Sequence, residues 1–279
     1  MNATDRYTFE QYQSLRGVNW STLRHMDTSA LAYRENLLNP PPSTAVMDLG
    51  SAMHAAILEP EEFHARYAIF DGRRGTKAHQ EWQAENPGVT DLKPDEWDQV
   101  MGAAEAVHSR RQGKLARRIL RHARTEVTLQ WTDPDTHVRC KARPDIIGPT
   151  ILADVKTTGS VDPRRFGRLA ADMVYHGKMA FAAMGLREIG HPVERVTILA
   201  VEQKPPHDVG VFDICQGDLE RSEQHVANLL SQLKTCRRRR IWPGRCENTQ
   251  VLDLPPWLFE SDNDISDLGI AFEVVGGTR

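Results

Sequence analysis

The sequence is poor in features that would tie the chain to an oxidising compartment or a structural metal. Only four cysteines occur in 279 residues, at positions 140, 215, 236 and 246, and no two of them form a CxxC pair. Neither a structural zinc site nor a thioredoxin-like motif is therefore indicated. Their scatter gives no local support for an iron–sulfur cluster. Reduced, structural thiols are the expectation in a cytosolic setting.

Long apolar runs are also missing. No stretch approaches the roughly 18 uncharged apolar residues that a helix needs to cross a bilayer. The first residues, MNATDRYTFEQYQ, lack the basic and apolar segments of a signal peptide. The content of 40% hydrophobic and 26% charged residues is ordinary for a globular chain and excludes a disordered one. We therefore expect a cytoplasmic protein with no membrane partner.

The net charge of −3 hides strong local differences. Residues 110–124 carry seven Lys or Arg and no acid, and residues 237–240 are consecutive arginines, whereas acids dominate 59–62 and 260–267. A protein that holds metal ions with carboxylates and contacts phosphates nearby would show this distribution. The alternative is that each basic run is the solvated face of a helix.

Hydrophobic periodicity divides the chain into a helical first part and a strand-rich second part. Ser21 is the expected cap of a short helix, and Pro94 opens a long one at its first turn. The segment 71–92 is rich in glycine and charge and is expected to be irregular. The expected helices are 7–15, 47–67 (interrupted at 59–60), 94–109 (resuming past residue 113), 162–172, 174–187 and 218–240. The expected strands are 126–132, 137–147, 150–157, 193–202 and 209–214. This order predicts an α/β fold in which helices pack on a sheet.

Two acids and a lysine form the strongest chemical signal. Asp145 follows a proline, Asp154 comes after eight more residues, and Lys156 lies two residues further, with a turn at 148–149 between the acids. If the turn has two residues, Asp145 pairs with Leu152. Because side chains alternate along a strand, Asp145, Asp154 and Lys156 then share one face of a hairpin. Leu152 shares that face, whereas Ile151, Ala153 and Val155 point to the other face and can enter the core.

These groups suit the hydrolysis of a phosphodiester. Carboxylate oxygens are the ligands that Mg²⁺ or Mn²⁺ prefers, and the metal activates a water and neutralises charge on the phosphate. A lysine close to a metal ligand can orient or deprotonate that water, or stabilise the transition state. Since D-x-K is a frequent tripeptide, the alternative is a surface ion pair between Asp154 and Lys156.

Matches along the rest of the chain extend this pattern. Together they resemble the RecE-like exonucleases (the exodeoxyribonuclease VIII type) of the PD-(D/E)xK nuclease superfamily. The similarity covers roughly residues 7–258. Its elements are 49–60 (LGSAMHAAILEP), 126–131 (EVTLQW), 140–145 (CKARPD), 154–158 (DVKTT), Tyr175-His176, Phe181, 201–206 (VEQKPP) and 242–244 (WPG).

The resemblance implies a restriction-endonuclease-like core with a central mixed β-sheet flanked by helices. It implies one nuclease domain over residues 1–279, in which a helical part (about 1–122) supplies a metal ligand to a strand-rich core (about 124–240). By this resemblance the metal ligands are His54, Asp145 and Asp154, and Lys156 joins the two acids as the catalytic lysine. The implied cofactor is Mg²⁺, with Mn²⁺ as the alternative.

The resemblance also implies an activity and partners. Such enzymes degrade double-stranded DNA from its ends, 5′→3′ and without ATP, and leave 3′ single strands for recombination in bacterial or phage-infected cells. They form homo-oligomeric rings and work with a RecT-like single-strand annealing protein. The absence of a GxxxxGK[ST] phosphate loop agrees with ATP independence. The alternatives are a RecB-like repair nuclease or endonuclease on the same core, and a catalytically silent module that binds DNA ends.

One position departs from the pattern, and several residues are secondary candidates. Related helices carry a glutamine where this chain has Lys178, which could contact a phosphate instead or be exposed to solvent. Glu126 and Tyr175 are candidate supports of the active site. The expected contacts to DNA phosphates are Arg143, Lys178, Arg164 and Arg165, with Arg168 and the 110–124 cluster.

Overall fold

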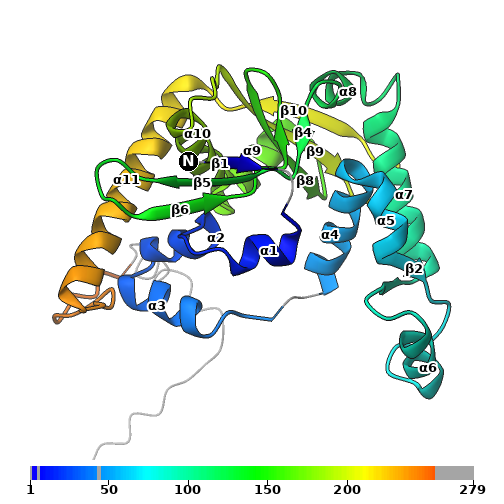
Figure 1. Cartoon of the computed structure of the whole chain (residues 1–279), viewed down its shortest axis with the longest axis horizontal. Coiled ribbons are helices and arrows are strands. Elements are labelled where there is room, and N and C mark those ends of the chain that lie inside the picture. Colours follow the sequence, from blue (N-terminus) through cyan, green and yellow to red (C-terminus); the bar gives the residue numbers. More distant parts are fainter. Residues whose placement is uncertain (1, 5–6, 43–44, 255–279) are drawn as a thin grey trace, which may run out of the picture.

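The computed structural model describes residues 2–4, 7–42 and 45–254, in which helices surround a five-stranded, a three-stranded and a two-stranded sheet (Figure 1). The helices are α1 (Phe9–Ser14), α2 (Trp20–Leu23), a 3₁₀ turn (Arg24–Asp27), α3 (Ala30–Leu38), α4 (Ala45–Leu58), α5 (Pro60–Arg66), α6 (Lys77–Glu85), α7 (Pro94–His108), α8 (Lys114–Leu120), α9 (Pro163–Asp172), α10 (Tyr175–Glu188) and α11 (Gln216–Arg239). None of these described helices is long and apolar enough to cross a membrane.

The main sheet is mixed and has the strand order β10-β9-β8-β7-β4. Within it β8 and β9 run parallel, while the other neighbours are antiparallel. Its strands are β4 (Arg124–Thr125), β7 (Ile146–Ile147), β8 (Ile151–Thr158), β9 (Arg195–Glu202) and β10 (Val209–Asp213). The other sheets are β1-β5-β6, formed by β1 (Asn2–Thr4), β5 (Thr128–Thr132) and β6 (Arg139–Ala142), and the pair β2 (Tyr67–Ile69) and β3 (Thr90–Leu92). The central mixed sheet flanked by helices confirms the expected fold class.

The expectation of one strand over residues 137–147 was wrong. The chain forms β6, leaves the sheet after Ala142 and joins the main sheet as β7 at Ile146. Pro144 lies in the break and has no backbone N–H with which to continue a ladder. The neighbouring segment is interrupted opposite this break, between β4 and β5, where Glu126 has φ +53°. The backbone N–H of Glu126 donates to the carbonyl of Asp145 at 3.0 Å, which ties the two breaks together.

The hairpin register differs from the expected one by two residues. Ile146 pairs with Ala153, and Ile147 pairs with Leu152, so Asp145 lies opposite Asp154 rather than Leu152. The two-residue turn was wrong, because the connection is longer and closes with Gly148 N–H donating to the carbonyl of Ile151. A shift of two residues preserves the alternation of side chains. The expected shared face of Asp145 and Asp154 is therefore retained.

Two further expectations were wrong. The segment 71–92 is not irregular, since it contains α6, whose first turn is capped by Thr76, and β3, which pairs with β2. The short helix α2 begins two residues earlier than expected. Its cap is Asn19, whose side chain accepts from the N–H of Thr22, rather than Ser21. The interruption at 59–60 and the helices over 94–108 and 114–120 agree with the sequence.

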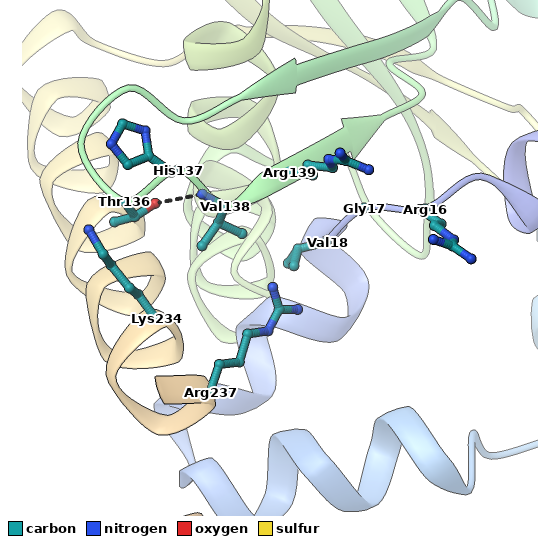
Figure 2. A pocket seen from close by; sticks show the side chains of 9 residues that line it. All are labelled: Arg16, Gly17, Val18, Thr136, His137, Val138, Arg139, Lys234 and Arg237. Carbon is teal, nitrogen blue, oxygen red and sulfur yellow. Dashed lines mark hydrogen bonds between the residues drawn. The ribbon is translucent and has the colours of Figure 1, made fainter. Parts of the chain in front are cut away.

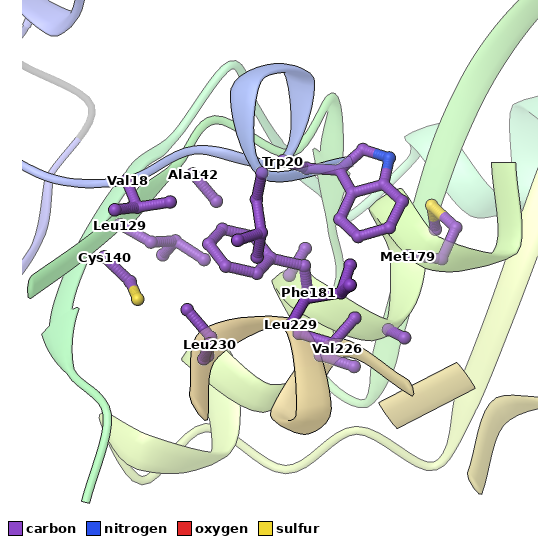
Figure 3. Packing of buried hydrophobic residues seen from close by; sticks show 14 of the residues in the cluster. Val18, Trp20, Leu129, Cys140, Ala142, Met179, Phe181, Val226, Leu229 and Leu230 are labelled. Carbon is purple, nitrogen blue, oxygen red and sulfur yellow. The ribbon is translucent and has the colours of Figure 1, made fainter. Parts of the chain in front are cut away.

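Buried side chains pack in two large clusters on either side of the main sheet. One contains residues of α4 and α7 with Ala153 and Val155 of β8, and the other joins Leu152 to α2, α10 and α11. Figure 3 shows Trp20 of α2 resting on the second cluster next to Phe181 and Met179 of α10.

Gly177 brings the first turn of α10 close to α2. A Cβ atom at Gly177 would lie 2.2 Å from Cζ2 of Trp20, so only glycine permits this approach. Met179, two residues after Gly177 in the same turn, is 1% exposed and packs in the core. The backbone at Lys178 is thus held in place from both sides.

Candidate active site

Asp145 and Asp154 face each other on neighbouring segments of the main sheet. Their side chains are only 3% and 2% exposed, respectively. One oxygen of Asp145, Oδ2, accepts the backbone N–H of Val155 at 2.8 Å, which fixes the carboxylate against β8. Two carboxylates at this depth need cationic partners, because an unpaired buried charge is strongly unfavourable.

His54 reaches the carboxylates from α4. This helix buries Ala52, Met53 and Ile57 against the main sheet. His54 remains partly exposed, and its Nε2 lies 2.7 Å from Oδ2 of Asp145 while its Nδ1 lies 3.5 Å from Oε1 of Glu126. A residue 91 positions away in the sequence thus contacts Asp145, as the resemblance implies.

Glu126 enters the site through its unusual backbone. Its left-handed conformation is costly for a residue with a side chain, and such strain is concentrated at functional positions. The carboxylate contacts His54 on one side and the guanidinium of Arg143 on the other, with Oε2 2.6 Å from Nε. Glu126 therefore holds the imidazole from the side opposite Asp145.

Two lysines neutralise the acids. The ammonium of Lys156 pairs with Oδ2 of Asp154 and lies 5.0 Å from the ring centroid of Tyr175. The ammonium of Lys178 bridges the acids, with Nζ 3.0 Å from Oδ1 of Asp145 and in contact with Oδ1 of Asp154. Lys178, the departure from the family pattern, is thus part of the cluster and is not simply exposed.

The cluster shifts the titration of its members. Burial opposes a charge on His54, but Asp145 and Glu126 outweigh it and raise the pKa of the imidazole to about 10. Burial alone would raise the pKa of Asp145, yet the charges of His54 and Lys178 hold it well below its usual range. Burial likewise opposes the ammonium of Lys178, and the two aspartates raise its pKa above the ordinary value. In this state the imidazole is a cation that donates to Asp145, so binding a metal there requires the loss of its proton.

The donor set fits a divalent cation. His54, Glu126 and Asp145 each offer one ligand atom, and these atoms lie within 4.8 Å of one another. Carboxylate oxygens with one imidazole suit Mg²⁺ or Mn²⁺. Of the expected ligands His54, Asp145 and Asp154, the first two belong to this group, while Asp154 contacts the ammonium groups of Lys156 and Lys178. Glu126, expected only as a support, takes the third place in the group.

The residues expected to contact DNA differ in their exposure and in their partners. Arg143 donates to Glu126, to the carbonyl of Tyr7 and to Thr128, and its side chain is 10% exposed, so its position gives no support to a phosphate contact. Arg164 and Arg165 are exposed on α9. The buried Phe166 of the same helix packs on Tyr175, which in turn faces Lys156. Their helix therefore adjoins the acidic cluster.

Basic side chains also gather in two pockets. Figure 2 shows one of about 430 Å³, with basic side chains from the start of β6, from α11 and from the segment before α2 around it. Its lining is Arg16, Gly17, Val18, Thr136, His137, Val138, Arg139, Lys234 and Arg237. The second, of about 670 Å³, is lined by His108, Arg110, Lys114, Arg117, Arg118, Leu120 and Arg121, within the basic cluster noted in the sequence. Neither lining contains an acidic side chain, which suits a polyanion.

Tyr12 of α1 is a neighbour of the site that the sequence did not indicate. Burial raises the pKa of its hydroxyl to about 12, and the charges of Lys178 and Arg143 act on it in the opposite direction. Nothing in a single sequence links α1 to site residues as far along the chain as Arg143 and Lys178. Its proximity follows from the tertiary fold alone.

Comparison with known proteins places this geometry in a family. Residues 19–255 match the model of a PDDEXK-like domain of unknown function, DUF3799. The chain belongs to the DUF3799 family. The matched range contains the D…D-x-K pattern of Asp145, Asp154 and Lys156. Membership confirms the broader part of the resemblance, and the RecE-like type remains a prediction.

One solved structure supports the fold of this DUF3799 member. The crystal structure of a "Putative exonuclease" from Eubacterium rectale superposes with a TM-score of 0.60 at 14% identity, covering 96% of this chain and 100% of that one. An alkaline exonuclease from Laribacter hongkongensis matches at 14% identity and a TM-score of 0.28, over 68% of this chain and 97% of its own. No curated protein matches the sequence.

Proposed function

We propose that this protein is a metal-dependent exonuclease that degrades double-stranded DNA from its ends. The observation that carries the proposal is the buried pair Asp145 and Asp154, flanked by the lysine of the D-x-K pattern and by the donor group of His54 and Glu126. The names of the two similar structures support the class of activity. We further propose Mg²⁺ as the cofactor, 5′→3′ polarity without ATP, and 3′ single strands as products for recombination.

Each residue has a chemical role in this proposal. A bound cation supplies an activated water and neutralises charge on the phosphate. Asp145 and Asp154 would hold it together with His54 and Glu126, and Asp154 also contacts the ammonium of Lys156. Since Tyr175 restricts Lys156 from the other side, the ammonium is oriented to donate to an attacking water or a phosphate oxygen.

The wider organisation belongs to the same proposal. The chain would act as one domain, in which the helical part up to about residue 122 supplies His54 to the core over about 124–240. A homo-oligomeric ring, a RecT-like annealing partner and a cytoplasmic setting complete it. These follow from the resemblance to RecE-like enzymes.

The class of activity is tested by asking whether the protein degrades DNA only from its ends or also cuts it internally. Linear duplex DNA should be degraded in Mg²⁺, a covalently closed circle of the same sequence should stay intact, and excess EDTA should stop digestion. Gel electrophoresis with a linearised sample of the circle as matched control measures this. Cutting of the circle would instead indicate an endonuclease, and binding without cutting in Mg²⁺ or Mn²⁺ would indicate a silent module. Duplexes labelled at the 5′ or the 3′ end, with and without a 5′ phosphate, then give the polarity.

Removal of two arginines of α9 should weaken DNA binding. In the double variant Arg164→Ala, Arg165→Ala we expect KM for duplex DNA to rise about tenfold with little change in kcat, because phosphate contacts position the substrate. The dependence of binding on salt should become shallower. Arg221→Ala is the control, since Arg221 is an exposed arginine on α11 with a side chain 78% accessible. Equal effects of the control and the double variant would count against a specific contact at α9.

A further inference from the structure

All four oxygens of the two aspartates already have donors. Oδ2 of Asp145 is contacted by His54 and by the N–H of Val155, and Oδ2 of Asp154 by Lys156. The two remaining oxygens, one on each aspartate, share a single donor, the ammonium of Lys178. A divalent cation that bridges these two remaining oxygens therefore has to displace that ammonium.

Of these donors, Lys178 can leave the two carboxylates most easily. The N–H of Val155 belongs to the backbone of β8, and His54 is itself a candidate metal ligand. The side chain of Lys178 is 34% exposed, twice the 17% of Lys156, so its ammonium has a path to solvent. The backbone beneath it stays in place, because Gly177 lies against Trp20 and Met179 is buried. A change of side-chain rotamer alone thus opens the site.

We propose that Lys178 is an internal cation that holds Asp145 and Asp154 together in the metal-free protein and competes with the divalent ion for them. The proposal rests on the metal site put forward above. The ammonium stands within bonding distance of both acids, so it relieves their repulsion before a metal arrives. The same contact weakens metal binding, because the apparent affinity falls with the fraction of molecules whose site is open.

Titration of the protein with Mn²⁺ in the absence of DNA tests the competition. Isothermal calorimetry on Lys178→Gln and Lys178→Met should give a dissociation constant about tenfold or more below that of the wild type, because the site is then open in every molecule. Lys178→Arg keeps the charge and should not bind more tightly than the wild type. The control Lys77→Gln removes an equal charge from α6, where Lys77 is 90% exposed, and should leave the affinity unchanged.

Thermal unfolding provides a second measurement. In EDTA, Lys178→Gln should melt below the wild type, since the two carboxylates lose their shared counter-ion, and saturating Mn²⁺ should raise its Tm by more than that of the wild type. An affinity of Lys178→Gln and Lys178→Met equal to or weaker than that of the wild type overturns the proposal. If Lys178→Gln is unfolded in EDTA, folding on addition of Mn²⁺ supports it, and failure to fold with Mn²⁺ counts against it.

The outcomes separate this proposal from the proposed nuclease activity. If the wild type digests DNA and Lys178→Gln binds Mn²⁺ no more tightly, only the competition fails. If the wild type neither binds Mn²⁺ nor digests DNA but Lys178→Gln binds it, the competition stands and the nuclease activity of the natural chain fails. If neither protein binds Mn²⁺, the metal site itself is absent and both proposals fall.

Discussion

Replacement of Lys156 by alanine should lower the rate of metal-dependent DNA digestion by about 10³-fold, within the range that one acid–base or electrostatic group contributes. The ammonium is the cationic group of the D-x-K pattern, and Asp154 and the ring of Tyr175 keep it at the acidic cluster. Asp154→Ala should cause a loss of the same order, since it removes the anchor of Lys156 and a carboxylate of the site.

Single-turnover digestion of an end-labelled duplex at saturating protein measures this effect without a contribution from binding. The matched control is Lys77→Ala on α6, whose side chain is 90% exposed. Circular dichroism and thermal melting should show that Lys156→Ala is folded, because the side chain of Lys156 is partly exposed and is not part of the buried apolar clusters. Undiminished digestion by both Lys156→Ala and Asp154→Ala would reject the assigned site.

The shared face of the acids was predictable even though the turn was not. The period of a strand is two residues, so the two-residue error in register between Asp145 and its partner left the side chains on the same side. A one-residue error would have moved Asp145 to the opposite face. The alternation of side chains along a strand therefore predicts which face they occupy, even where the length of the turn is predicted wrongly.

The break between β6 and β7 lay beyond sequence periodicity. Residues 137–147 alternate between polar and apolar side chains almost throughout and so look like one strand, and only Pro144 interrupts the backbone donors. The chain changes sheets there because the segment at Glu126 does the same and the two are hydrogen bonded. Since such a break depends on a partner strand, one segment alone does not reveal it.

The composition of the site was only partly accessible from the sequence. His54 was named through the resemblance, since no spacing rule connects α4 with Asp145 across 91 residues. Lys178 was noticed as a departure, but its bridge between two carboxylates depends on the close approach of α10 to α2 at Gly177. Glu126 was predicted only as a support, because a strand-end acid is usually exposed. Its left-handed backbone turns it towards His54 instead.

Lys141 is a buried cation with no role in the acidic cluster. Its ammonium donates to the carbonyls of Tyr12, Gln13 and Leu15 at 3.0, 2.9 and 2.8 Å, and it lies 4.9 Å from the ring centroid of Tyr12. These carbonyls end α1, where a positive charge is favourable. Burial lowers the pKa of Lys141, so the charge carries a desolvation cost that the three carbonyl contacts offset. The side chain thus fastens α1, which adjoins the site through Tyr12, to β6.

Lys141→Met should reduce the free energy of unfolding by about 2 kcal/mol, because it removes the shared donor of three carbonyls while keeping the apolar stem. Denaturation by urea, followed by circular dichroism, measures the change. Arg139→Met is the matched control, since Arg139 is the exposed residue two positions earlier on β6, and it should shift stability by less than about 0.5 kcal/mol. A loss for Lys141→Met no larger than that of the control would show that water replaces the ammonium at the end of α1. A loss of the expected size would show that α1 is fastened to β6 by one side chain, and local exchange of α1 amides should then rise in the variant.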